Sequence, residues 1–220
     1  MGEHDNTLIL YHSSTVEVAN PRWDFAVGTD SERNDFGLGF YTAIEPEQPL
    51  MLLCDQPQVV LNTYRLDLTG LSIKRLSNDT EWLMSVVFSR RNFNAKPHIH
   101  SIRDRYRKSL EGVDIIIGAI ANDRLFSTIN AFIENNITDA VATACLKSMQ
   151  YQPQYVQKSN LACSRLAFLG SEVFEGHRLE GIRARVVRER ELMEDRMIAI
   201  KEQLYREGRL LSEILREEAS

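Results

Sequence analysis

The sequence predicts an α+β fold, because short apolar β segments and amphipathic helical segments follow one another over the first three quarters of the chain. The chain has 220 residues and 43% hydrophobic content, which suffices for a core of its own. After residue 170 the composition changes to a charged helical pattern without proline. We therefore expect one domain over residues 1–170 and a C-terminal charged amphipathic helix over residues 171–220.

Three segments are rich in β-forming residues. Residues 7–12 predict a short strand that runs into Ser13 and Ser14, so His12 is expected at a strand end. Residues 58–66 and 113–121 are the two clearest strands. The segment 113–121 is apolar on both faces and is therefore expected at the centre of a sheet.

Three further segments carry apolar residues at helical spacing. Residues 80–91 predict a helix with Asp79 as its N-cap, and residues 127–135 and 138–149 predict two more, the last with Thr138 as its cap. Between the strands, residues 20–39 concentrate glycine, proline, asparagine and aspartate, which predicts a long ordered loop. Loops of that length are usually functional or disordered.

From residue 171 onward, arginine and glutamate dominate, and apolar residues recur at three- and four-residue steps. The pattern predicts one long helix with a break near Gly208. Some 40 helical residues would span roughly 60 Å, so this helix should pack on its own domain or on a partner. Gaps at Glu189 and Gly208 leave a coiled coil, and therefore the oligomeric state, undecided.

Composition excludes several classes of protein. A net charge of -5 argues against binding nucleic acid mainly through a global positive field. Three scattered cysteines suggest neither a disulfide framework nor a zinc knuckle and favour a reducing, cytoplasmic compartment. The longest apolar run, residues 115–121, is far short of the roughly 20 residues that a bilayer requires, so no membrane association is expected. His98 and His100 lack a third ligand nearby, so we expect a solvated loop there and no metal site.

Three local patterns carry the candidate chemistry. They are Leu-Tyr-His-Ser-Ser over residues 10–14, the turn Asp-Phe-Gly-Leu-Gly-Phe-Tyr-Thr over residues 35–42, and Gln-Tyr-Val-Gln over residues 154–157, which opens a late strand after a loop that contains proline. Each is weak alone. His12 is compatible with a structural histidine, Tyr41 with a core aromatic residue and Gln154 with a surface strand residue.

Together and in this order, the patterns resemble the ADP-ribosyltransferase superfamily, in the branch of diphtheria toxin and the poly(ADP-ribose) polymerases. The signature of that branch is Leu-x-His-Gly-Ser/Thr at a strand end, then Gly-x-Gly-Ile/Phe-Tyr, then a glutamate heading a late strand. The version over residues 35–41, with Ala-Asn-Asp at residues 121–123, resembles bacterial members found as toxins of toxin-antitoxin pairs. The resemblance covers about residues 7–170 and implies a split β-sheet core with flanking helices.

The resemblance implies NAD as co-substrate and gives the matching residues their roles. His12 would hydrogen-bond the adenine-side ribose, the backbone at Ser13 would meet the nicotinamide carboxamide, and Tyr41 would stack on the nicotinamide ring. Gly37 and Gly39 would let the backbone approach NAD closely. The implied catalytic residues are Gln154, His12 and Tyr41. The implied NAD-binding residues are His12, Ser13, Ser14, Gly37, Gly39, Phe40 and Tyr41.

Gln154 is the main departure from the family pattern, because it falls where the relatives carry glutamate against the 2'-hydroxyl of the reacting ribose. An amide can hydrogen-bond that hydroxyl but supplies no negative charge and no general base. We therefore expect a mono-transferase, slowed by about 10² to 10³ relative to a site with a preorganised charge. Residues 49–53 show no match to the second tyrosine and the serine that some relatives place there.

The expected function is an intracellular bacterial toxin that transfers ADP-ribose to a protein or nucleic-acid acceptor. One alternative is a catalytically inactive domain of the same fold that binds NAD or a partner, with Gln154 as the mark of lost chemistry. Another is an interaction protein whose helix over residues 171–220 docks an antitoxin or dimerises.

Overall fold

The computed structural model describes residues 6–24, 34–77, 79–90, 97–120, 128–148, 152–204 and 206–219. The strands are β1 (Thr7–Ser14), β2 (Phe40–Ala43), β3 (Gln58–Asp67), β4 (Ile73–Arg75), β5 (Ile115–Gly118), β6 (Gln154–Gln157) and β7 (Leu166–Glu175). The helices are α1 (Glu47–Leu53), α2 (Thr80–Arg90), α3 (Pro97–Lys108), α4 (Thr128–Ile133), α5 (Asp139–Ser148), α6 (Asn160–Ser164), α7 (His177–Gln203) and α8 (Leu211–Glu217).

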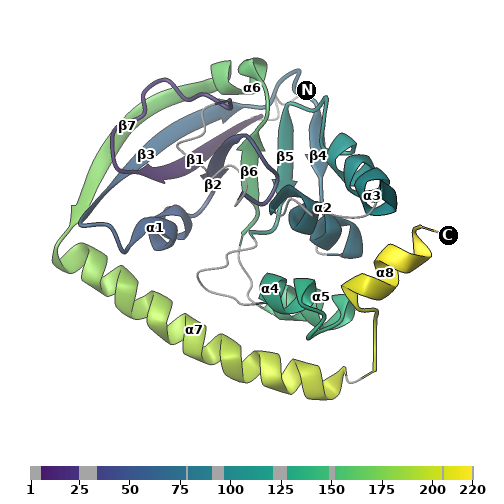
Figure 1. Ribbon diagram of the computed structural model, residues 1–220. Coiled ribbons are helices and arrows are strands. Elements are labelled where there is room, and N and C mark those ends of the chain that lie inside the picture. Colours follow the sequence, from purple (N-terminus) through teal and green to yellow (C-terminus); the bar gives the residue numbers. More distant parts are fainter. Residues whose placement is uncertain are drawn as a thin grey trace, which may run out of the picture.

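The strands form one mixed seven-stranded sheet in the order β4-β5-β6-β2-β1-β3-β7 (Figure 1). Neighbouring strands are antiparallel except β4 and β5, which are parallel. Helices α1, α2, α4, α5 and α7 gather on one side of this sheet (Figure 1). The short α6 lies at the end of the sheet that is farthest from α7 (Figure 1). The predicted α+β class is confirmed.

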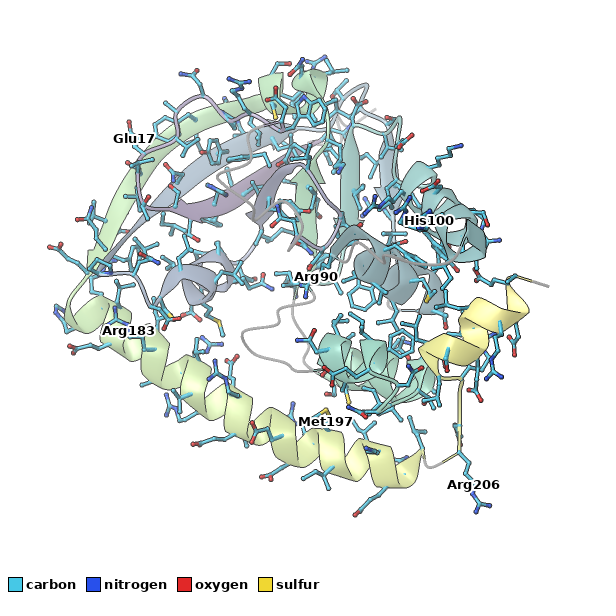
Figure 2. All side chains as sticks on the ribbon, in the orientation of Figure 1. Glu17, Arg90, His100, Arg183, Met197 and Arg206 are labelled. Carbon is cyan, nitrogen blue, oxygen red and sulfur yellow. The ribbon has the colours of Figure 1, made fainter. Side chains whose placement is uncertain are left out.

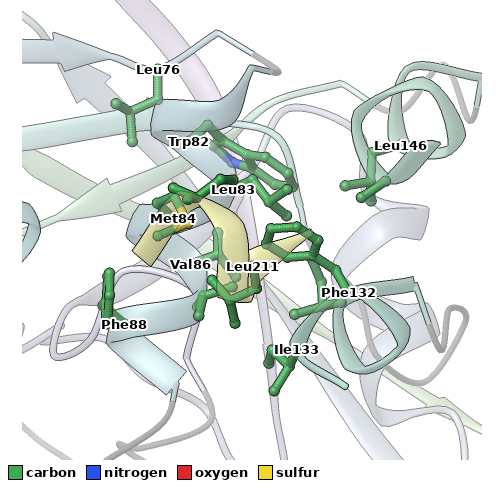
Figure 3. Packing of buried hydrophobic residues seen from close by; sticks show 14 of the residues in the cluster. Leu76, Trp82, Leu83, Met84, Val86, Phe88, Phe132, Ile133, Leu146 and Leu211 are labelled. Carbon is green, nitrogen blue, oxygen red and sulfur yellow. The ribbon is translucent and has the colours of Figure 1, made fainter. Parts of the chain in front are cut away.

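Side chains of alternate strand residues enter separate cores on the two faces of the sheet. On the helix-covered face, Val156 of β6 joins a cluster with Trp82 of α2 and Phe132 of α4 (Figure 3). On the other face, Tyr155 packs with Leu10 of β1, in a cluster that also holds Phe40, Tyr64 and Leu66. A third cluster, Leu50, Val59, Leu61 and Leu179, lies beneath α1 and the first turn of α7.

Long periodic segments and their caps were predicted correctly. The strands predicted at residues 7–12, 58–66 and 113–121 correspond to β1, β3 and the shorter β5, and the three predicted helices correspond to α2, α4 and α5. Asp79 accepts a hydrogen bond from the backbone N–H of Trp82 at 3.0 Å. Thr138 accepts one from Val141 at 3.3 Å, so both predicted N-caps are present.

Two local predictions are wrong. The loop expected around His98 and His100 is the first turn of α3, and the last residues of the turn expected over residues 35–42 belong to the strand β2 (Phe40–Ala43). Gly37 and Gly39 precede β2 and do not interrupt it. Strand β2 pairs with β1 along one edge and with β6 along the other.

The predicted start of the C-terminal helix at residue 171 is also wrong. Strand β7 continues to Glu175, where it pairs with Gln58, and α7 begins only at His177. The boundary expected between residues 170 and 171 therefore falls inside a strand of the sheet. The break expected near Gly208 is present: α7 ends at Gln203, α8 begins at Leu211, and Gly208 has a φ of 78°.

Helix α7 packs along its own domain. It crosses the helix-covered side from the end of β7 to the region of α5 (Figure 1). Leu179 is buried in the cluster beneath α1, and Met197 and Ile200 near its other end pack against the cluster of α2, α4 and α5. Helix α8 then enters that cluster with Leu211 and Ile214. In the part of the chain that the structure describes, no helix combines the length and apolarity needed to cross a membrane.

The burial of α8 gives a direct prediction of stability. Ile214 is 1% exposed in the core, whereas Ile198 on α7 is 58% exposed. We expect Ile214→Ala to lower the free energy of unfolding by about 2 to 5 kcal/mol, because it removes buried methyl groups and leaves a cavity. The matched substitution Ile198→Ala should change it by about 0.5 kcal/mol or less. Equal effects in urea unfolding would show that α8 is not part of the folded core.

Candidate functional site

The two central strands β1 and β2 meet at a single point. Tyr11 and Ala43 form the one register pair between them, whereas β1 pairs with β3 along eight residues and β2 with β6 along four. Beyond that pair, residues 12–14 of β1 and 40–42 of β2 lie across from one another without ladder pairing. We call these two stretches the seam. The seam carries five of the residues that the sequence singled out: His12, Ser13, Ser14, Phe40 and Tyr41.

The His12 imidazole bridges the seam. Its Nδ1 lies 2.8 Å from the backbone oxygen of Tyr41, and its ring packs on Phe40 with 4.3 Å between ring centres. A carbonyl oxygen only accepts, so Nδ1 carries the proton and donates it. Burial lowers the pKa of His12 below its ordinary value of 6.5, which favours the neutral ring at pH 7. In that tautomer Nε2 is a hydrogen-bond acceptor, and no described residue donates to it.

The two serines beside His12 are tied to the protein through their hydroxyls. Ser13 Oγ donates to the backbone oxygen of Pro49 in α1, and Ser14 Oγ donates to the backbone oxygen of Val16. Asn62, fully buried on β3 and opposite His12, accepts from the N–H of Val18 at 2.8 Å and donates to Ser14 Oγ at 3.2 Å. The chain therefore leaves β1 in a fixed path. Sequence reasoning missed Asn62, although a lone amide directly after the apolar run 59–61 was a visible signal.

The Tyr41 hydroxyl holds the turn that precedes β2. It donates to the backbone oxygen of Gly37 at 2.7 Å and accepts from the N–H of Phe36 at 3.0 Å. Burial, reinforced by the nearby charge of Asp35, raises the pKa of Tyr41 well above its ordinary value. The phenol is therefore neutral and already engaged at its oxygen, and its ring packs against the helix-side core.

The two glycines of the turn, Gly37 and Gly39, are each required for a different structural reason. Gly37 has a φ of 70°, which an L side chain rarely adopts, and has open space where a Cβ would lie. At Gly39 a Cβ would lie 2.5 Å from Cγ1 of Val156, so this glycine allows the turn to pack on β6. Lys158 secures the same turn by donating to the backbone oxygens of Phe36 and Leu38, and burial lowers the pKa of Lys158 to about 8.

Gln154 heads β6, as the sequence predicted, and is 6% exposed. Its Nε2 donates to Oδ2 of Asp35 at 2.6 Å and to the backbone oxygen of Ala119 at 3.1 Å. Oδ1 of Asp35 in turn accepts from Nε of Arg90 at 3.0 Å, within a buried ion pair. Arg90 ends α2 near the middle of the molecule (Figure 2). Sequence reasoning gave no role to Asp35 or Arg90, although Asp35 opens the quoted motif.

The candidate residues reach the seam from both faces of the sheet. Tyr41 and Gln154 lie on the helix-covered face and are connected through the turn of Asp35. His12 and Phe40 lie on the opposite face, where Phe40 belongs to the other core. The link between His12 and Tyr41 runs through the main chain of Tyr41 and not through its ring. The seam, and not one face of the sheet, is the feature that they share.

Two further regions were named from the sequence, residues 121–123 and 49–53. Ala-Asn-Asp at 121–123 lies outside the described residues. The segment 49–53, which shows no match to the second tyrosine and the serine of the resembling pattern, belongs to α1, in which Leu50 and Met51 are buried. Helix α1 therefore presents a backbone oxygen to Ser13 and contributes no aromatic ring, since its sequence is Glu-Gln-Pro-Leu-Met-Leu-Leu.

The lowered pKa of His12 predicts a loss of stability in weak acid. Below about pH 6.5 the unfolded chain protonates His12 while the folded chain resists, so the unfolded state binds more protons and stability falls as the pH falls. We expect His12→Gln to show a smaller loss of unfolding free energy between pH 7 and pH 5 than the parent chain. His177→Gln, at an exposed histidine of α7, is the control. Identical pH dependence in the parent and His12→Gln would contradict a neutral imidazole with a lowered pKa.

Comparison with known proteins assigns a family. No curated protein and no solved structure matches the chain. Residues 8–168 match the model of a family described as "Protein of unknown function (DUF3990)". The matched range begins in β1 and ends in β7, so it contains both stretches of the seam, Asp35, Arg90 and Gln154. Because the match covers nearly three quarters of the chain, the protein belongs to the DUF3990 family.

Proposed function

We propose that the protein is an NAD-dependent mono-ADP-ribosyltransferase with a split-sheet ADP-ribosyltransferase fold. The observation that carries the proposal is the seam: within the seven-stranded sheet, the ladder between β1 and β2 is reduced to one register pair. The motif residues His12 and Ser13 lie on one side of it and Tyr41 on the other. Backbone groups and side chains of two strands are presented together there, as binding of an extended dinucleotide would require.

The His12 tautomer suits the role that the resemblance implies. With Nδ1 donating to Tyr41, Nε2 is an acceptor and can receive a hydrogen bond from a ribose hydroxyl. The neutral state favoured by burial keeps that acceptor available at pH 7. His12 thus binds and orients the sugar and takes no part in proton transfer.

The reaction in this proposal requires little acid-base chemistry. A nucleophile of the acceptor bonds to C1' of the nicotinamide-side ribose, the C1'–N bond breaks, and nicotinamide leaves as a neutral molecule with the bonding electron pair. The nucleophile loses its proton to its own surroundings. Positioning and electrostatics supply most of the acceleration of such a reaction. Gln154 Oε1 accepts from the ribose 2'-hydroxyl, and the Tyr41 ring, its hydroxyl engaged in the turn, offers an apolar face to nicotinamide.

The amide at position 154 limits the product. Without a carboxylate there, no general base activates a hydroxyl of a previously attached ADP-ribose, so transfer stops after one unit. We further propose that the acceptor is a protein or nucleic acid of the cell in which the chain is made and that the transfer is toxic. This part rests on the resemblance of residues 35–41 to toxin-type members.

A second candidate function is NAD or partner binding without transfer. The engagement of both amide hydrogens of Gln154 with Asp35 and Ala119 favours it, because a residue held this firmly is also suited to a purely structural role. Incubation with NAD labelled in its adenylate half separates the two functions: a transferase labels an acceptor, whereas a binding domain retains intact NAD.

Expression of the chain in bacteria tests the transfer itself. We expect ADP-ribose adducts on one or a few acceptors, found by mass spectrometry of the proteins and nucleic acids, together with slowed growth. His12→Ala should lower adduct levels at least about tenfold, because one hydrogen bond to the ribose is lost. The exposed-site control His177→Ala should leave them unchanged. Adducts that are equally abundant with His12→Ala would contradict the assignment of His12.

Gln154→Ala tests the catalytic position. Loss of the acceptor aimed at the reacting ribose should lower kcat for NAD cleavage by about 10² or more, with a smaller change in KM. Gln203→Ala, at the exposed end of α7, is the matched control. Unfolding curves of both variants verify that the fold is retained. A Gln154→Ala enzyme as fast as the parent would show that Gln154 is not in the catalytic site.

A further inference from the structure

Asp35, Gln154 and Arg90 form a buried polar cluster beside the seam. Asp35 is 5% exposed and Gln154 6% exposed, and the Asp35–Arg90 ion pair has side chains that are less than one tenth exposed. We infer that Asp35 is the positioning residue of the site: it fixes the orientation of the Gln154 amide and holds the negative charge that similar enzymes carry at position 154. This inference rests on the proposed function.

The hydrogen bonds determine which way the amide faces. The carboxylate of Asp35 and the backbone oxygen of Ala119 can only accept, so both must face the Nε2 of Gln154 and not its Oε1. Both amide hydrogens are thereby used. Oε1 is left as the free group of the side chain, and Gln154 acts as a pure acceptor toward a ligand hydroxyl.

The charges explain why the pair is arranged in this way. Asp35 contributes a carboxylate and Arg90 a guanidinium to the cluster, and Arg90 contacts Oδ1 of Asp35 while Gln154 contacts Oδ2. A glutamate at position 154 would put a second carboxylate about 2.6 Å from the first, and two like charges this close repel one another. Burial strengthens this repulsion. A glutamine at 154 is therefore the residue that an aspartate at 35 requires.

Asp35 also connects the two ends of the candidate site. It immediately precedes Phe36, whose N–H donates to the Tyr41 hydroxyl. The same short turn thus positions the Tyr41 ring and the Gln154 amide. A change at residue 35 is expected to act on ligand turnover through Gln154, without direct contact between Asp35 and the reacting atoms.

Exchange of the two side chains tests the inference. Asp35→Asn removes the carboxylate to which Arg90 and Gln154 donate, and Gln154→Glu adds a second carboxylate, whereas the double variant Asp35→Asn/Gln154→Glu restores one carboxylate and one amide. We expect each single variant to lower kcat for NAD cleavage by about 10- to 100-fold, as for loss of a hydrogen bond to a charged group. The double variant should recover to within about tenfold of the parent. KM should change less than kcat in every case.

Matched controls and a second readout make the outcomes distinct. Asp195→Asn and Gln203→Glu repeat the same chemistry at exposed positions of α7 and should leave kcat unchanged. A double variant in which the losses of the single variants multiply would overturn the pairing. If the parent neither binds nor cleaves NAD, the proposed function fails. The pairing is then decided by unfolding free energies alone: a double variant more stable than both single variants supports it, and additive losses of stability overturn it.

Discussion

The incomplete pairing of β1 with β2 is the constraint on which the rest of the structure depends. Strand β1 pairs with β3 along eight residues of its other edge and β2 with β6 along four, so the missing pairs of these two strands lie between β1 and β2. Backbone groups at that place need partners from outside the ladder. The His12 imidazole is one such partner, since its Nδ1 donates a hydrogen bond to the backbone oxygen of Tyr41. The residues around the seam are therefore those whose conformation the protein must fix by side-chain contacts.

The helices keep the two halves of the sheet in register across the seam. Strands β1, β3 and β7 form one half and β2, β6, β5 and β4 the other. Helix α7 starts at the end of β7 and reaches α5, where Arg196 donates to the backbone oxygen of Ser148 at 3.2 Å (Figure 1). Near its start, Arg183 donates to the backbone oxygens of Cys54 and Gln56. The C-terminal segment thus connects both halves of the sheet and ends in α8, which packs in the helix-side core.

The sequence predicted the elements whose signals are local. Apolar periodicity located α2 and β3, and Asp79 and Thr138 marked real helix starts. It missed β2 because glycines beside a short strand look like a turn, and β7 because a half-exposed edge strand carries no continuous apolar run. The Asp35–Arg90–Gln154 cluster was beyond reach, since its members are 55 and 119 residues apart along the chain and meet only in the folded protein. Motif order singled out His12 and Tyr41 as candidates, but it could not show that their side chains lie on opposite faces of the sheet.

Hydrogen-deuterium exchange with and without NAD tests the central claim most directly, because it reports where the dinucleotide binds whether or not it reacts. The account predicts that saturating NAD slows exchange in peptides covering residues 11–16 and 35–43 and leaves β7 and the exposed middle of α7 unchanged. Binding without slower exchange on both sides of the seam, or protection confined to another part of the molecule, would contradict it.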